Sequence, residues 1–356
     1  MPRRGQHRRF DQAEAVASTP ALESGYAALV LERLAKQICR VASVEMSCIF
    51  VRDRKDPRTV IAAAGHGIPW ELLGGRFGAD EGLIGQVLAD GAPILAQEFS
   101  ELVGPLDAAV GAGCMGAAVP VRWNGSVGGA LSAGSCSPGR SLGDEELFLL
   151  AELADLAAAA LEHADSRRQF DDLMKAHVEA LAAAMDMRDR RTARHSEDVV
   201  RLACAVGRLL GLEPATLVEL EFAARLHDVG KIRVPDAVLH KPGPLDDDEY
   251  EVICCHAAWG AETLASIPGL EAVATIVRFH HERWDGLGYP DRLGGARIPL
   301  ASRIISACDA FAAMVADRPY RRAMTGGDAL DEVCAKAGTQ FDPSVVDALV
   351  EVVGPS

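Results

Sequence analysis

Histidines and aspartates in the second half of the chain form an ordered set that could bind metal ions. Only ten His occur among the 356 residues, and five of them belong to this set together with two Asp. The seven residues are His195, His227, Asp228, His256, His280, His281 and Asp309. Imidazoles combined with carboxylates suit iron, manganese or zinc, whereas magnesium and calcium sites are built from oxygen ligands alone. Seven ligands are too many for one open catalytic ion, so the set predicts two ions.

The sequence around this set resembles the HD-GYP family of metal-dependent phosphodiesterases, from about residue 170 to about residue 350. Two strings carry most of the resemblance, HDVGKI at 227–232 and HHERWDGLGYP at 280–290. The other matching segments are VPDAVL (234–239), KPGPL (241–245), His256 with Gly260, RPYR (318–321) and FDP (341–343). The length of the second string makes chance agreement negligible.

The resemblance implies how the seven residues divide between two divalent ions, with iron or manganese as the expected metals. In the family the His–Asp pair ends a helix, and the aspartate, here Asp228, bridges the ions. One ion would bind His195, His227, Asp228 and Asp309, and the other would bind Asp228, His256, His280 and His281. Two such ions activate water and clamp phosphate oxygens. They also supply the local positive charge that a protein of net charge -15 needs for an anionic substrate.

The residues expected to contact the substrate are Lys231, Arg318, Arg321 and Tyr289. Lys231 follows the catalytic His–Asp pair by about one helical turn, and in the family this lysine contacts phosphate and takes part in catalysis. Arg318 and Arg321 resemble the family's second phosphate clamp, with an ion pair to Asp317 as the alternative. Tyr289 belongs to the GYP loop, which is expected either to recognise the second nucleotide or a partner domain, or only to position the His pair.

Two positions depart from the family pattern. Some members bind a third ion with a Glu four residues before the first ligand histidine, and here that position is Arg191. Its positive charge would repel an extra ion, so a binuclear centre is expected. Ala312 stands where the family usually has a second Asp, a change that can weaken activity but removes no metal ligand.

Helices are expected to position these residues, so 165–356 are predicted to form an all-α HD-GYP domain. Apolar residues recur there at helical spacing between Pro and Gly punctuation. The predicted helical segments are 173–187, 195–210, 214–227, 246–264, 270–282, 300–316, 326–337 and 343–352.

Residues 25–164 are predicted to form an α+β domain with an antiparallel sheet flanked by helices. A helix is expected over 26–41 and another over 144–164, with β-rich runs between them at 46–51, 59–64, 93–96, 117–121 and 127–132. The order and the phrases GHGIP (65–69), DEGLIGQV (80–87) and AVPV (118–121) resemble a GAF domain, the small-molecule sensor and dimerisation module of signalling proteins. Residues 1–24 lack periodicity and are expected to form a flexible tail.

The ligand expected for the GAF-like domain is an unidentified small molecule. Cys48, Cys114, Cys136 and His66 are candidate cofactor anchors, but buried thiols and a turn histidine are the preferred interpretation. Nine Cys without a C-x-x-C pair indicate reduced thiols. With no long apolar run and no signal peptide, a cytoplasmic protein without membrane insertion is expected. The acidic balance of 51 Asp+Glu against 36 Lys+Arg argues against DNA binding.

An interrupted apolar heptad pattern predicts a helix from about Asp144 to Met185 that pairs with its copy in a homodimer. The residues expected to be buried against the second chain are Leu149, Leu153, Leu156, Phe170, Met174 and Leu181. Polar residues at His163, Arg167 and His177 interrupt the pattern. Two helices that pack only on their own domains are therefore the alternative.

The complete ligand set and the GYP loop together imply an enzyme that hydrolyses cyclic di-GMP to linear pGpG, and to GMP if hydrolysis continues, with its rate set by the GAF domain. One alternative is a phosphohydrolase that acts on another nucleotide or cyclic dinucleotide with the same metals. The other is a non-catalytic module that binds a cyclic dinucleotide and signals through partner proteins. Degenerate family members usually lack metal ligands, and this chain has all seven, which favours an enzyme.

Overall fold

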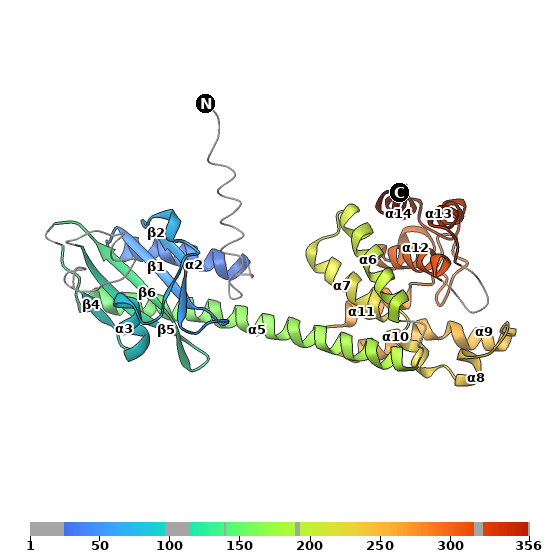
Figure 1. Cartoon of the computed structure of the whole chain (residues 1–356), viewed down its shortest axis with the longest axis horizontal. Helices are drawn as coiled ribbons and strands as arrows, with labels where there is room; N and C mark the ends of the chain where they lie inside the picture. The colour runs from blue at the N-terminus through green and yellow to red at the C-terminus, as the bar shows by residue number, and fades with distance from the viewer. Residues whose placement is uncertain (1–24, 97–113, 139, 189–192, 317–322, 355–356) are drawn as a thin grey trace, which may run out of the picture. The chain divides into compact units, whose positions relative to one another are not determined.

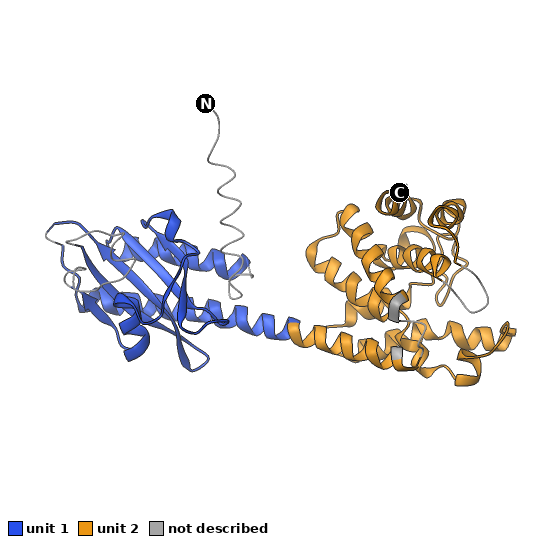
Figure 2. Cartoon of the chain, in the orientation of Figure 1, with its two compact units in different colours: residues 1–171 blue, residues 172–356 orange. Residues whose placement is uncertain are grey.

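The computed structural model describes residues 25–96, 114–138, 140–188, 193–316 and 323–354. Two compact units make up the chain, unit 1 (Met1–Asp171) and unit 2 (Asp172–Ser356), as Figure 2 shows. The tail expected over residues 1–24 lies outside the described residues. The boundary expected after residue 164 stays a prediction, because one continuous helix covers residues 144–188.

Unit 1 is built around a six-stranded antiparallel sheet of order β3-β2-β1-β6-β5-β4 (Figure 1). Its strands are β1 (Met46–Arg52), β2 (Thr59–His66), β3 (Arg76–Gly78), β4 (Ile94–Ala96), β5 (Met115–Trp123) and β6 (Ser126–Ser135). Its helices are α2 (Gly25–Val41), α3 (Gly82–Asp90), the 3-10 turn η1 (Trp70–Leu72) and the first part of α5 (Asp144–Arg188). Asn124 and Gly125 join β5 to β6 with φ of 52° and 75°, the positive values that a tight hairpin turn requires.

Helices cover both faces of this sheet, which explains why its central strands are buried almost throughout. Alternate residues of β1 point to opposite faces. Ile49 and Val51 pack with side chains of α2 and α5, whereas Cys48 and Phe50 pack with side chains of α3. The α+β class predicted for this part of the chain is confirmed. Strand β3 was missed because its three residues, RFG, include an arginine and a glycine, whereas the equally short β4, ILA, is apolar throughout.

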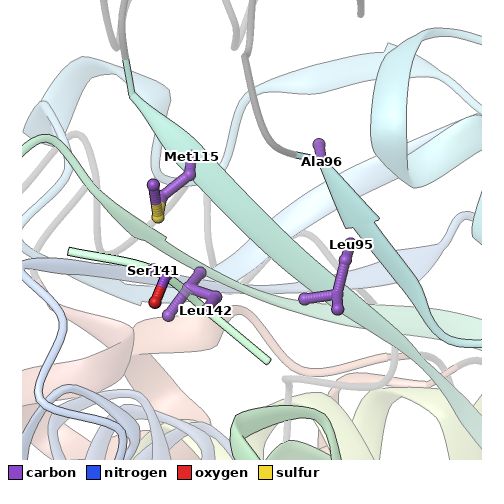
Figure 3. A pocket seen from close by; sticks show the side chains of 5 residues that line it. All are labelled: Leu95, Ala96, Met115, Ser141 and Leu142. Carbon is purple, nitrogen blue, oxygen red and sulfur yellow. The ribbon is translucent and has the colours of Figure 1, made fainter. Parts of the chain in front are cut away.

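A small pocket of unit 1 lies beside β4 and β5 (Figure 3). Its volume is about 30 Å³. Leu95, Ala96, Met115, Ser141 and Leu142 line it. Pockets that hold cofactors or drug-sized ligands are about ten times larger. This pocket therefore identifies no ligand, and the expected small-molecule ligand stays a prediction.

Unit 2 contains helices and no strand longer than a single bridge among its described residues, as predicted. After the end of α5 they are α6 (Ala193–Leu209), α7 (Pro214–Leu226), α8 (Asp236–Leu239), α9 (Asp247–Cys254), α10 (His256–Ala265), α11 (Glu271–Arg278), α12 (Leu300–Val315), α13 (Gly326–Ala335) and α14 (Pro343–Val353). Two short 3-10 helices, η3 (Val229–Arg233) and η4 (Gly295–Arg297), complete it. The helix expected over 246–264 is divided into α9 and α10 at Cys255, and the one expected over 270–282 ends at Arg278.

Helix α5 is a single helix of 45 residues, in agreement with the helix that the heptad pattern predicts from about Asp144 to Met185, and no break separates the segments expected over 144–164 and 173–187. Its later part joins the hydrophobic core of unit 2 through Met174, Val178 and Met185. The expectation that Met174 is buried against a second chain is therefore wrong, because its own unit covers it. Leu156 and Phe170 of the same expected set are exposed.

None of the described helices is both long and apolar enough to span a membrane. The expected cytoplasmic location stays a prediction.

A disulfide joins Cys114 and Cys136 in unit 1, which corrects the expectation that all nine cysteines are reduced. The two residues directly flank the last pair of the β5–β6 ladder, Met115 with Ser135, so the register itself brings their Cα atoms to 4.1 Å. Neither sulfur is therefore a free thiol anchor for a cofactor. Cys48 is buried as expected, and its burial raises the pKa of its thiol.

We expect denaturing alkylation to label seven cysteines before reduction and nine after it, because seven are free. Mass spectrometry of the intact chain measures both numbers. Reduction should also lower the free energy of unfolding of unit 1 by about 3 kcal/mol, since the bond closes a loop of moderate length. Labelling of all nine residues without a reducing agent would contradict the disulfide.

Candidate metal centre

Three of the histidines expected to bind metal lie at helix ends of unit 2. His227 directly follows α7, His256 begins α10 immediately after α9, and His280 follows α11. All three side chains are almost completely buried. The helix ends converge, since the His227 and His280 rings are 5.3 Å apart and the His256 and His280 rings are also 5.3 Å apart.

The same hydrogen bond orients each of these three imidazoles. Nδ1 lies 2.7 Å from the carbonyl oxygen of Ala224 in His227, 2.6 Å from that of Ile253 in His256 and 2.6 Å from that of Val277 in His280. A carbonyl group only accepts, so Nδ1 carries the proton and Nε2 has a free lone pair. Such a bond fixes the tautomer and ring orientation in metal-binding histidines.

The seven expected ligands gather into two groups. The first contains His195, His227 and Asp309, and the second contains His256, His280 and His281, with the candidate ligand atoms of each group within 4.8 Å of one another. Asp228 lies between the groups. Its Oδ2 is 3.6 Å from Nε2 of His227 and its Oδ1 is 3.5 Å from Nε2 of His256. The division of the seven residues between two ions stays a prediction.

Two longer helices complete the first group. α6 carries His195 and α12 carries Asp309, and Nε2 of the histidine lies 2.8 Å from Oδ1 of the aspartate. The same oxygen is 3.8 Å from Nε2 of His227. His195 and Asp309 are partly exposed, whereas His227 of the same group is buried.

Burial keeps the imidazoles of the second group neutral. Desolvation lowers the pKa of His256 and places that of His280 well below its ordinary value. Desolvation, reinforced by the charge of His256, lowers the pKa of His281 to about 3. Neutral imidazole is the form that binds metal ions.

The two carboxylates are ionised although they are buried. Burial alone would raise the pKa of Asp228, but the charge of Lys231 and the nearby imidazoles hold it well below the ordinary value. Burial would likewise raise the pKa of Asp309, but the hydrogen bond with His195 and the neighbouring imidazoles lower it to about 2. Neutral imidazoles with ionised carboxylates form a donor set that fits divalent transition metal ions.

Lys231 lies on η3, immediately after the His–Asp pair. Its Nζ is 2.6 Å from Oδ2 of Asp228, and its main-chain nitrogen donates to the Asp228 carbonyl oxygen at 2.9 Å. The lysine is thus held beside the carboxylate that lies between the two groups. Its contact with a substrate phosphate stays a prediction.

η3 and α10 approach each other so closely that only glycine fits at Gly230. A Cβ atom there would lie 1.9 Å from the carbonyl oxygen of His256 and 2.5 Å from the nitrogen of Gly260. Both neighbours are main-chain atoms and cannot turn away. The contact sets the distance between the segment that carries Asp228 and the start of the helix that carries His256.

The GYP loop lies against the second group. The Tyr289 ring is 4.8 Å from the His281 ring, and burial raises the pKa of its hydroxyl. The loop returns onto the buried Glu282, whose Oε1 accepts from the main-chain nitrogen of Asp291 at 2.7 Å. The peptide bond between Tyr289 and Pro290 is cis. Both interpretations of Tyr289 require this position beside the His pair, so a contact with substrate stays a prediction.

Several residues named from the sequence are not tested by this geometry. Arg318, Arg321 and Arg191 lie outside the described residues. Ala312 is buried in the apolar core of unit 2 on α12.

Comparison with known proteins identifies both parts of the chain. A family model described as HD domain matches residues 150–345, more than half of the chain, and one described as GAF domain matches residues 28–162. The chain therefore belongs to the HD domain family. Its first part is a GAF domain, so the resemblances expected for the two parts are confirmed.

Curated relatives match this chain mainly over the HD domain. The cyclic di-GMP phosphodiesterase response regulator RpfG of Xanthomonas campestris is 40% identical over 52% of this chain and 50% of the relative. A cyclic di-GMP phosphodiesterase of Thermotoga maritima is 34% identical over 58% of this chain and 55% of the relative. A 3'3'-cGAMP-specific phosphodiesterase 2 of Vibrio cholerae is 37% identical over 48% of this chain and 33% of the relative. The chain thus spans about half the length of the first two relatives.

We expect Gly230→Ala to destabilise unit 2 by about 3 kcal/mol, because the added methyl group meets main-chain atoms. Denaturant titration followed by circular dichroism measures the loss. Gly326→Ala is the matched control, since a Cβ atom there meets nothing within 4 Å. If the two variants unfold at the same denaturant concentration, η3 and α10 can move apart without loss of stability, and the expectation is wrong.

Proposed function

We propose that unit 2 is a metal-dependent phosphodiesterase that hydrolyses cyclic di-GMP to linear pGpG, and to GMP if hydrolysis continues. The observation that carries the proposal is the position of Asp228 between two groups of three possible ligands. A single ion would not need both groups. The names of the Xanthomonas and Thermotoga relatives support the substrate.

The residues proposed to hold two divalent ions are His195, His227, Asp228 and Asp309 for one, and Asp228, His256, His280 and His281 for the other. Iron or manganese is the proposed metal because the ligands mix imidazole with carboxylate. Bound ions of this kind activate water and neutralise the charge that develops on a phosphodiester. The chain's own hydrogen bonds from Nδ1 to helix-end carbonyl groups keep three Nε2 atoms directed to the centre.

Substrate contacts are proposed for Lys231, Tyr289, Arg318 and Arg321. Lys231 would bind a phosphate oxygen from its place beside Asp228, where it also keeps this carboxylate ionised. Tyr289 lies beside the His281 ring, within reach of a base that enters next to the second group. The two arginines would bind the other phosphate through their guanidinium groups.

A second candidate substrate is 3'3'-cGAMP, because this nucleotide is named for the Vibrio relative, which is 37% identical. The same ligand set would serve both nucleotides, since the phosphodiester groups are chemically equal. The two nucleotides differ in one base, so contacts outside the metal centre would decide between them. A non-catalytic binding module is the less favoured candidate, because nothing in the ligand set is missing.

The test is a turnover assay over cyclic di-GMP, 3'3'-cGAMP and nucleotide monoesters, with metal analysis of anaerobically purified protein. We expect two ions per chain and the fastest turnover of cyclic di-GMP. His227→Ala combined with Asp228→Ala should abolish turnover and keep the helical circular dichroism, because it removes ligands without creating a large core cavity. If the metal-loaded protein hydrolyses none of these nucleotides, the proposed phosphodiesterase activity is wrong. If the purified protein contains no metal, the proposed metal site is wrong.

We also propose that the protein is a cytoplasmic homodimer whose GAF domain regulates unit 2 through α5. The support is an exposed apolar stripe on α5, formed by Leu156, Phe170 and Leu173, which are 56%, 47% and 54% exposed. Leu156 and Phe170 are two heptads apart and Leu173 follows three residues later, the spacing of a coiled-coil seam. A second copy of α5 would remove this stripe from water.

Light scattering should accordingly give twice the chain mass of 37.7 kDa for the full chain. Leu156→Glu combined with Phe170→Glu should give the monomer mass, because charges in the seam oppose association. Glu179→Gln, at an exposed position of the same helix, is the control and should remain dimeric. A monomeric wild type at working concentrations would refute the dimer.

A further inference from the structure

Arg188, the last residue of α5, is bound to the end of η3. Its guanidinium group donates to the main-chain carbonyl oxygen of Ile232, to that of Val234 at 2.6 Å and to Oδ1 of Asp236 at 2.8 Å. Three acceptors within five consecutive residues thus share one side chain. That side chain is largely covered, being 28% exposed.

The chemistry of a helix end explains this contact. The last carbonyl groups of a helix have no partner within the helix, and a positive charge near them is favourable. Val234 is fully buried, so water has little access to its carbonyl oxygen. A planar guanidinium with several donors can serve these acceptors together, which an ammonium group cannot do equally well. Arg188 therefore closes the C-terminal end of η3.

The opposite end of η3 carries residues of the candidate metal centre. Asp228 immediately precedes η3, and Lys231 within it binds Asp228 through both side chain and main chain. Gly230 is in contact with the first turn of α10. η3 has only five residues, so the orientation of its last residues also determines that of its first.

We propose that Arg188 is a positioning residue that holds η3 so that Asp228 and Lys231 keep their orientation toward the metal centre. Among the described contacts it touches none of the seven ligand residues, so it acts through η3. The catalytic consequence rests on the proposed function. The effect on η3 itself does not, and it can be measured without substrate.

The experiment compares the full-length wild type with Arg188→Ala, Arg188→Lys and the control Arg201→Ala. Arg201 is an exposed residue of α6 that pairs with Asp198. Hydrogen exchange, followed by mass spectrometry, reports the amides of 229–239, where the amide of Lys231 donates to Asp228 and that of Val234 donates to Lys231. The same samples are assayed for metal content and for kcat and KM with cyclic di-GMP.

In Arg188→Ala we expect at least tenfold faster exchange over 229–239, with α12 and the metal content unchanged. The value of kcat should fall about 10- to 100-fold, more than KM rises, because a misplaced catalytic group impairs the reaction more than binding. The exchange rate and kcat of Arg188→Lys should lie between those of wild type and Arg188→Ala, since a lysine ammonium group can make only part of the arginine's contacts. Arg201→Ala should match wild type.

Two outcomes would overturn the proposal. Exchange and kinetics of Arg188→Ala equal to those of Arg201→Ala would show that η3 needs no clamp. Faster exchange throughout unit 2 with loss of metal would show that Arg188 maintains the whole fold and not this segment. A wild type without turnover would refute the proposed function instead, and the exchange measurement would still decide the role of Arg188.

Discussion

A buried imidazole can direct one nitrogen toward a metal ion only if its other nitrogen has a hydrogen-bond partner, and unit 2 is organised around this requirement. His227, His256 and His280 meet it in the same way, with the carbonyl group three residues earlier. These carbonyl groups lie in final helical turns, where acceptors would otherwise be unpaired. One bond therefore satisfies two groups, and the ends of α7, α9 and α11 must meet at one place.

A main-chain contact sets the distance between η3 and the start of α10. η3 rests on the start of α10 at Gly230, where no side chain fits. The backbone carrying Asp228 thereby comes near enough to α10 for its Oδ1 to lie 3.5 Å from the His256 ring nitrogen. Glycine at one position thus allows a carboxylate to lie between the two groups of possible ligands, and the surrounding apolar core of unit 2 holds the two elements in place.

The fold class and the seven gathered residues could be predicted from the sequence, but several helix ends could not. The helices expected over 246–264 and 270–282 are interrupted or end where His256 and His280 donate to carbonyl groups that a continuous helix would use itself. The spacing of apolar residues does not reveal that a histidine side chain competes with a main-chain amide for the same carbonyl group. The disulfide was missed for another reason, because Cys114 and Cys136 become neighbours only through the register of β5 and β6.

Helix α5 contains neither Gly nor Pro among its 45 residues, so it lacks the usual positions at which helices kink. At a side-chain radius of about 5–6 Å, a rotation of about 20° carries the tip of a side chain through about 2 Å. The donor–acceptor distance of a hydrogen bond varies by only about 0.5 Å. The Arg188 contacts with Ile232, Val234 and Asp236 therefore require that the last turn of α5 keep its angle about the helix axis.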